Sequence, residues 1–297
     1  MASRKIVSFD WAIKNILRDK ANYDVLEGFL YALLKEKIVI TELVESESNQ
    51  QSAEMKFNRV DLLAINESGE HIIIEVQYSP EQSFFKRLLY GTSKDIVDNM
   101  KSGSDYSNVK KVYSVSLIYF DVELHSQGEQ PVDYVYHGKV DFTGLHNGKQ
   151  VKIDSNFLVG YDQANKEDIN VFPEYFIIPI TIFNDVINDD LDEWIYAFKH
   201  NEVKEEFTAP GIDVMSEKLD FLAMPPVKQR LYTKYLEDMA SDRGTLSFAK
   251  SKGRAEGVIE GKIEGKIETA INLKSLGIDT SIIAQSTGLE ISVIENL

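Results

Sequence analysis

The sequence predicts an α/β domain with a mixed β-sheet flanked by helices, followed by a helical C-terminal tail. Three observations carry this prediction. Two helical patterns open the chain, a hairpin of apolar strands comes next, and a third helix connects the hairpin to another strong strand. An antiparallel hairpin combined with a helical crossover produces a mixed sheet.

The first elements follow from the spacing of apolar residues. A helix is expected at 9–20, where apolar side chains recur at helical intervals. Asn22 or Asp24 suits the N-cap of a second helix that extends to residue 36. A strand is expected at 38–44, and the polar residues 45–56 are typical of a loop.

A β-hairpin is expected at 58–65 and 71–78, because these apolar stretches flank a short polar loop that contains Gly69. The helix after it is expected at 79–103. Ser79 suits its N-cap, Pro80 its first turn and Gly103 its end, and a strand at 110–122 follows.

The next part of the chain, 122–170, is rich in turn residues, with short strands expected within 132–140 and 155–161. A strand at 174–183 contains Pro179, which indicates an edge strand or a bend. The remainder is expected to be mainly helical, at 191–200, at 213–224 and after Pro225-Pro226.

We expect a main domain at 1–245 and a tail at 246–297. The tail repeats every four residues between 253 and 268, with Gly and Glu recurring in register. As a helix this repeat could mediate self-association or act as a spacer, and the alternative is a solvated linker. The segment after it resembles a helix-turn-helix. Because it has no Lys or Arg after Lys274, packing or regulation is favoured over DNA readout.

Composition narrows the classes of protein. The net charge is −16, which argues against a general nucleic-acid coat. There is no cysteine, so disulfides and thiolate metal sites are excluded. The first residues lack the apolar stretch of a signal peptide, and no segment approaches the ~18 apolar residues of a membrane helix. We expect a cytoplasmic protein without membrane association. No loop for an organic cofactor is found.

The hairpin carries the candidate chemistry. Glu75 and Gln77 stand two apart within the apolar strand, and therefore share one face. If the loop closes about Ser68, Asp61 lies opposite Glu75. Two close carboxylates repel, and a divalent metal such as Mg²⁺ would relieve that repulsion. The alternatives are that Glu75 pairs with a Lys or Arg, or that this end of the hairpin is solvated.

Asp61 followed by Glu75-Val76-Gln77 resembles the D-x(n)-[DE]-x-K core of the PD-(D/E)XK nuclease superfamily. More narrowly, the chain resembles the recombination-promoting nuclease (Rpn), or PD-(D/E)XK transposase-like, family, in which Gln commonly replaces the Lys. The opening helices, the R-x-x-Y pair Arg87 and Tyr90, the G-x-x-Y pair Gly103 and Tyr106, and the Gly/Glu tail agree with it.

The resemblance implies a restriction-endonuclease-like fold and Mg²⁺-dependent cleavage of DNA, with Mn²⁺ as the alternative ion. Asp61, Glu75 and the Val76 carbonyl would bind the metal, and Gln77 would orient water or phosphate. Gln77 cannot supply a positive charge as Lys does. Glu27 is a further candidate ligand, with plain helix surface as the alternative. Asp10 is another, with N-capping or pairing with the helix dipole as its alternative.

The resemblance also implies DNA as the partner, contacted by Arg87 and Tyr90, although a structural pair with an acid is an equal alternative for Arg87. We expect a DNA endonuclease of the recombination-promoting or transposase-like kind, used in genome rearrangement or defence, and assembled as a homo-oligomer through the Gly/Glu repeat. The alternative is a catalytically weak or inactive nuclease fold that serves as a DNA-binding or assembly module.

Overall fold

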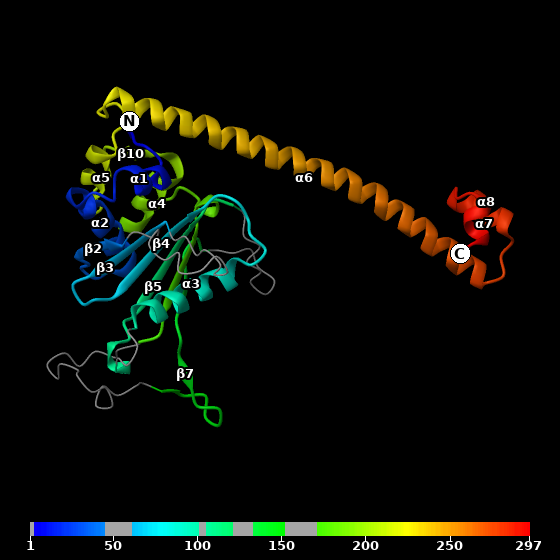
Figure 1. Cartoon of the computed structure of the whole chain (residues 1–297), viewed down its shortest axis with the longest axis horizontal. Coiled ribbons are helices and arrows are strands. Elements are labelled where there is room, and N and C mark those ends of the chain that lie inside the picture. The colour runs from blue at the N-terminus through cyan, green and yellow to red at the C-terminus, as the bar shows by residue number, and fades with distance from the viewer. Residues whose placement is uncertain (1–2, 45–60, 101–104, 121–132, 152–170) are drawn as a thin grey trace. The chain divides into compact units, whose positions relative to one another are not determined.

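The computed structural model describes residues 3–44, 61–100, 105–120, 133–151 and 171–297 (Figure 1). Several sequence predictions lie outside these residues: the loop at 45–56, the first residues of the strand at 58–65, Gly103, and the strand at 155–161. The chain forms two compact units, 1–229 and 230–297. The domain boundary after residue 245 stays a prediction.

A six-stranded mixed sheet forms the centre of the first unit, in the order β2-β3-β4-β5-β9-β6. Its first three strands are antiparallel, β4, β5 and β9 are parallel, and β6 returns antiparallel to β9. The strands are β2 (Ile40–Val44), β3 (Leu62–Asn66), β4 (His71–Gln77), β5 (Val112–Ile118), β6 (Tyr136–Gly138) and β9 (Glu174–Pro179).

Helix α3 (Phe84–Asn99) makes the crossover from β4 to the parallel strand β5. It covers the sheet face that carries Glu75, because its residues Phe84 and Leu88 pack on Ile118. The parallel register places Glu75 beside Ser116 and Gln77 beside Ile118. The expected α/β fold, with a mixed sheet flanked by helices, is therefore confirmed.

The opposite face of the sheet is apolar and meets a group of helices. Its residues Ile72, Ile74, Val115 and Leu117 are fully buried. The Tyr119 hydroxyl, just beyond β5, donates to a backbone carbonyl of α4 at 3.0 Å, so α4 lies on this side. The helices are α1 (Phe9–Asn15), α2 (Tyr23–Leu34), α4 (Asp190–His200) and α5 (Ile212–Lys218), which gather together in Figure 1.

An aromatic cluster holds these helices together. Phe9 of α1 stacks on Phe198 of α4 at 4.2 Å between ring centroids, and Phe29 of α2 contacts both Phe198 and Trp194. Gly28 permits the close approach, because a Cβ there would lie 3.0 Å from the Trp194 ring. Trp11 and Trp194 are both buried.

Several elements differ from the sequence predictions, since α1 ends at Asn15 rather than at 20 and α5 at Lys218 rather than at 224. Helix α3 begins at Phe84 rather than at Ser79 or Pro80, and Ser83 occupies its N-cap position. Strand β9 lies inside the sheet rather than at its edge, and Pro179 is its last residue. A 3-10 turn, Ile180–Ile182, follows there, since proline cannot donate to a continued ladder.

The smaller elements complete the first unit. They are β1 (Ser3–Lys5), β7 (Phe142–Thr143), β8 (Gln150–Val151), β10 (Glu202–Lys204) and the 3-10 turns Lys20–Asn22 and Tyr106–Asn108. Strand β1 pairs with β10, and β7 pairs with β8.

The Gly/Glu repeat is helical. It belongs to the 50-residue helix α6 (Pro226–Ser275), which is followed by α7 (Thr280–Thr287) and α8 (Ile291–Glu295). Ala270, Ile283 and Ile294 form a small core of the second unit, and the Lys274 ammonium donates to two carbonyls at the end of α8. Among the described residues, no helix combines the length and apolar character needed to cross a membrane.

Candidate metal centre

The hairpin has the register expected from its loop. Leu62 pairs with Ile74 and Ile65 pairs with His71, so the strands close about Ser68. Asp61 directly precedes β3 and is in line with Glu75. The Val76 backbone N–H donates to Asp61 Oδ2 at 2.7 Å, which ties the Asp61 carboxylate to the end of β4.

Asp61 and Glu75 line the same cavity of about 300 Å³. The cavity lies where β4 ends, so the departing chain forms one wall and α3 contributes another. Its lining residues are Asp61, Glu75, Val76, Gln77, Tyr78, Ser79 and Arg87. The structure therefore brings together the proposed catalytic residues and one of the two residues proposed to contact DNA.

Both carboxylates are held where ionisation is unfavourable. The Glu75 residue is only 7% exposed, and burial raises its pKa, with the Arg87 charge opposing the rise. Burial also raises the pKa of Asp61, against the Val76 hydrogen bond and the positive charge of Lys14. Each negative charge is thus placed in a cavity wall at a cost that a bound cation would reduce.

Arg87 supplies one positive charge at this cavity. Its Nη2 donates to Glu75 Oε2 at 3.4 Å and to Gln77 Oε1, and its Nε lies 3.3 Å from Glu81 Oε2. The alternative that Glu75 pairs with a basic residue is therefore realised in the structure. Since Arg87 is 32% exposed at its side chain, the pair is partly screened by solvent.

The Gln77 amide is hydrogen-bonded at both ends. Its Nε2 donates to the Ser79 carbonyl at 3.0 Å while its Oε1 accepts from Arg87. This arrangement fixes which end of the amide faces the guanidinium, and a Lys at this position would repel Arg87. A cation from α3 thus stands beside Gln77, at the position where the resembled D-x(n)-[DE]-x-K core has Lys.

Two candidate residues lie elsewhere. Glu27 does not line the cavity, and its Oε1 accepts from the Ile40 backbone N–H at 2.8 Å, where it supports the start of β2. Tyr90 is 43% exposed on α3 and is also outside the lining. A metal-binding role for Glu27 and a DNA-binding role for Tyr90 stay predictions.

Helix α1 and the turn after it place three charged residues near Asp61, of which the sequence analysis had singled out Asp10 alone. Lys14 Nζ lies 2.7 Å from the buried Asp10 carboxylate, and both charges influence the pKa of Asp61. Arg18 Nη2 donates to the Asp61 carbonyl at 3.5 Å. The sequence feature that predicts this ion pair is the spacing of Asp10 and Lys14, which stand four residues apart on one face of the helix.

The donor set suits a hard divalent cation. Mg²⁺ prefers oxygen ligands and is commonly bound by one or two carboxylates with water completing the shell. Asp61 and Glu75 provide two carboxylates in one cavity, both destabilised as anions by burial. A metal held entirely by protein side chains needs a cluster of three or more His, Cys, Asp or Glu residues, and no such cluster is found among the described residues. The residues present fit a metal that keeps several waters.

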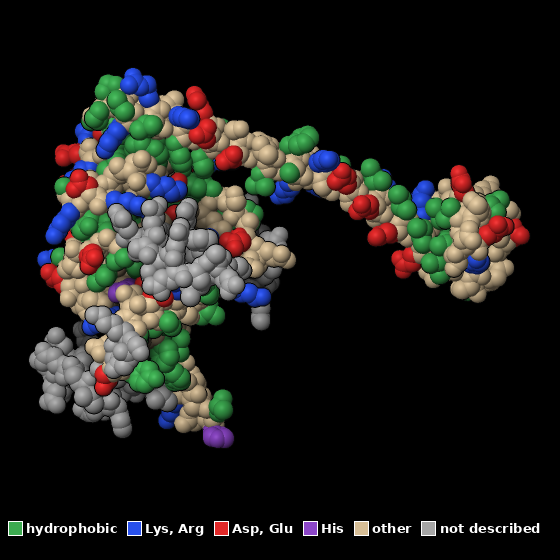
Figure 2. All heavy atoms as spheres, in the orientation of Figure 1, with side chains coloured by type: hydrophobic (Ala, Val, Ile, Leu, Met, Phe, Trp, Pro, Cys, Tyr) green, Lys and Arg blue, Asp and Glu red, His purple; other side chains and the backbone are tan. Residues whose placement is uncertain are grey.

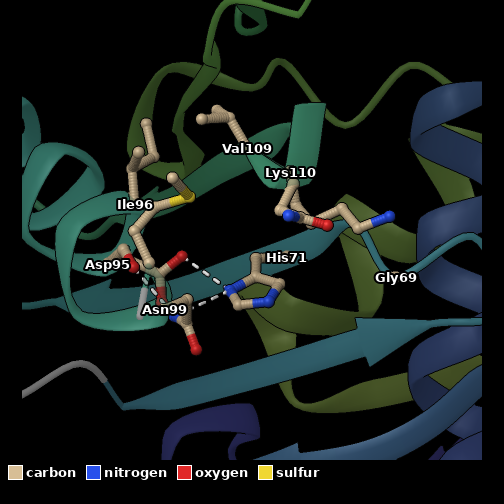
Figure 3. Close-up of a pocket in the computed structure, with 9 residues that line it drawn as sticks. Gly69, His71, Asp95, Ile96, Asn99, Val109 and Lys110 are labelled. Carbon is tan, nitrogen blue, oxygen red and sulfur yellow. Dashed lines mark hydrogen bonds and ion pairs between the residues drawn. The ribbon is translucent and has the colours of Figure 1, made fainter. Parts of the chain in front are cut away.

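A second cavity, of about 250 Å³, lies at the other end of β4 (Figure 3). His71 lines it and is buried, with 5% of its surface exposed. Its Nδ1 lies 2.7 Å from Oδ2 of Asp95 in α3, and Nδ2 of Asn99, also in α3, lies 3.3 Å from the same His71 nitrogen. These contacts anchor α3 to the start of β4, and they arise from tertiary packing that periodicity does not reveal.

The comparisons with known proteins agree with this geometry. Residues 7–149 match a family model described as PD-(D/E)XK nuclease family transposase. The matched segment contains the hairpin, the cavity residues and α3. No curated protein and no solved structure gives a significant match. Over residues 7–149, the chain is therefore similar to PD-(D/E)XK nuclease family transposases.

Proposed function

We propose that this protein is a Mg²⁺-dependent DNA endonuclease that hydrolyses phosphodiester bonds in the cytoplasm. The observation that carries the proposal is a pair of carboxylates, the half-buried Asp61 and the buried Glu75, in one cavity where β3 begins and β4 ends. The family match supports a nuclease-like role for the same segment. Mn²⁺ is expected to substitute for Mg²⁺, because both accept carboxylate and water ligands.

The proposed role of each residue follows from the chemistry of its side chain. Asp61, Glu75 and the Val76 carbonyl would hold the ion, and the Val76 N–H keeps the Asp61 carboxylate in position. A bound divalent ion supplies charge for the scissile phosphate and lowers the pKa of its water. Gln77 stays neutral at every pH, so its role is to orient water, phosphate or the Arg87 guanidinium rather than to supply charge.

The same site supports a second candidate function, a weakly active or inactive nuclease fold that binds DNA or assembles with other copies. The specific observation is that Arg87 already neutralises Glu75, as in a structural ion pair. The net charge of −16 and the neutral Gln77 also favour this alternative. The two candidates differ in whether the cavity binds a divalent ion and whether DNA is cut.

Nicking of supercoiled plasmid separates them. We expect wild-type protein to cut with Mg²⁺ or Mn²⁺ but not with Ca²⁺, and Asp61→Ala to lose the activity. Glu67→Ala is a matched control, because Glu67 is an exposed acid in the hairpin loop outside the cavity. If wild-type protein shows no metal-dependent cleavage, or if Asp61→Ala cuts equally well, the endonuclease proposal fails.

We also propose that α6 joins two copies of the chain. Between residues 233 and 269 no α6 side chain is buried, and the hydrophobic side chains are visible along it in Figure 2. An isoleucine row recurs every four residues, a ridge that packs against another helix. The row consists of Ile259, Ile263, Ile267 and Ile271.

The charges beside this row favour a parallel pair. Lys262 and Lys266 directly precede isoleucines, and Glu260, Glu264 and Glu268 directly follow them, so the two charges lie on opposite flanks. Facing helices bring opposite flanks together when parallel and like flanks together when antiparallel. Parallel pairing therefore sets Lys against Glu.

A single cysteine tests the orientation, since the chain has none of its own. Ile259→Cys should form a disulfide-linked dimer under mild oxidation, whereas Gly257→Cys, on the opposite helix face, should not. A monomer in sedimentation velocity would rule out self-association, and a dimer without cross-linking of Ile259→Cys would rule out the parallel arrangement.

A further inference from the structure

The Arg87 guanidinium is held with few of its donors in use. Arginine presents five N–H donors, yet both of its hydrogen bonds to the described residues come from Nη2. Its Nε lies 3.3 Å from Glu81 Oε2 as an ion pair, but no described residue accepts a hydrogen bond from it. The Arg87 guanidinium is therefore held mainly by its ion pairs, and several of its N–H donors remain available to another acceptor.

Arg87 also occupies the position where its charge competes with a metal. It contacts the Glu75 carboxylate, one of the two anions of the cavity, while Asp61 has only the Val76 N–H as a close donor to its side chain among the described residues. A divalent ion shared by Asp61 and Glu75 would lie beside the guanidinium. Like charges at that range repel in a partly buried site, so both cannot be held equally well.

We propose that Arg87 is a displaceable counter-cation: it neutralises Glu75 when no metal is bound, leaves Glu75 when a divalent ion binds, and then donates to a DNA phosphate. This inference rests on the proposed metal site. Glu81 gives the guanidinium an alternative partner outside the cavity, since Glu81 is exposed and does not line it. Once it has left Glu75, the planar guanidinium suits a phosphate, which can accept two parallel N–H hydrogen bonds from it.

Direct metal titration of the full-length protein tests the competition. Mn²⁺ binding is measured by calorimetry without DNA, for wild type, Arg87→Gln, Arg87→Lys and Lys86→Gln. Lys86 is the matched control, an exposed cation next in sequence that lies outside the cavity lining. It corrects for the general effect of removing one positive charge.

We expect Arg87→Gln to lower the Kd for Mn²⁺ by about twofold to fivefold, the effect of losing one partly exposed ion pair. Lys86→Gln should leave the Kd near the wild-type value. Arg87→Lys, which keeps the charge, should bind Mn²⁺ nearly as weakly as wild type. If Arg87→Gln binds Mn²⁺ no more tightly than Lys86→Gln does, or more weakly, the competition is refuted and Arg87 merely positions Glu75.

The transfer to phosphate is tested by DNA binding in Ca²⁺, followed by fluorescence anisotropy over a range of salt. Loss of one phosphate contact should weaken binding of Arg87→Gln and reduce its salt slope by about 1. An unchanged slope overturns the transfer.

Failure of the metal site is separable from failure of this inference. If wild-type protein shows no Mn²⁺ binding that Asp61→Asn removes, the proposed function itself is wrong. If that binding is present and Arg87→Gln does not strengthen it, only the role given to Arg87 is wrong.

Discussion

Replacing Glu75 by Gln should leave the fold as stable as wild type at neutral pH, or slightly more stable. The change removes the 3.4 Å ion pair with Arg87, which is partly exposed and contributes about 0.2–1 kcal/mol. Arg87 is not left alone, because Glu81 remains 3.3 Å away. Against this loss, the variant avoids the cost of ionising a buried carboxylate, the larger influence on the Glu75 pKa. We expect a change between zero and a stabilisation of about 1 kcal/mol.

Ile74, the residue before Glu75, provides a reference value for the change in the free energy of unfolding. Ile74 is fully buried on the other face of β4, and Ile74→Ala should lower the free energy of unfolding by about 2–5 kcal/mol. Urea unfolding of both variants is followed by tryptophan fluorescence. Trp11 and Trp194 are 4% and 0% exposed, so their emission reports the fold of the unit that contains the site.

The pH dependence has a defined sign. The pKa of Glu75 is raised above its ordinary value of 4.5, so the folded protein binds the proton more tightly than the unfolded chain. Wild-type stability contributed by this group therefore falls as pH rises from that value through the folded pKa. The advantage of Glu75→Gln should grow over the same window and disappear at lower pH. A loss of 2 kcal/mol or more at neutral pH, comparable to Ile74→Ala, would refute the reasoning and make Glu75 a structural ion-pair partner.

Three further predictions concern the packing of the fold. Gly28→Ala should lower the free energy of unfolding in urea by about 1–3 kcal/mol, since a Cβ would lie 2.9 Å from a backbone oxygen. Gly257→Ala is the control and should instead stabilise its helix, because a Cβ there meets nothing within 4 Å. Equal effects of the two substitutions would contradict the packing argument. Glu193→Ala should cost at least about 2 kcal/mol, because its carboxylate accepts two backbone N–H groups at 2.7 and 2.6 Å; an unchanged melting temperature would show that those donors find other partners. His71→Ala should cost about 1–3 kcal/mol by removing the 2.7 Å contact with Asp95, and a variant as heat-stable as wild type would exclude this contact as an anchor of α3.

The hairpin was the part of the site most open to prediction. Its register follows from a short loop around Gly69, which adopts a φ of +72°, and from the β-branched residues of β4. Once that register holds, Asp61 and Glu75 must meet, because opposed residues share a face. The pairing of two carboxylates was therefore predictable from local rules.

What could not be predicted depends on how α3 sits on the sheet. Sequence spacing places Arg87 on a helix, but whether it meets Glu75, solvent or DNA depends on the helix start and crossing angle. Because the helix starts at Phe84 rather than Pro80, Tyr78 and Ser79 lie outside it and line the cavity together with Arg87. The burial of His71 has the same origin, since Asp95 and Asn99 reach it from α3.

The central claim is that Asp61 and Glu75 exist to bind a catalytic metal, and plasmid nicking by Glu75→Gln tests it most directly. This variant keeps the shape of the side chain and is expected to keep the fold, so lost activity cannot be attributed to unfolding. With Mg²⁺ at neutral pH, we predict that the nicking rate falls at least about 100-fold below wild type. Cleavage at the wild-type rate by the folded variant would contradict the account.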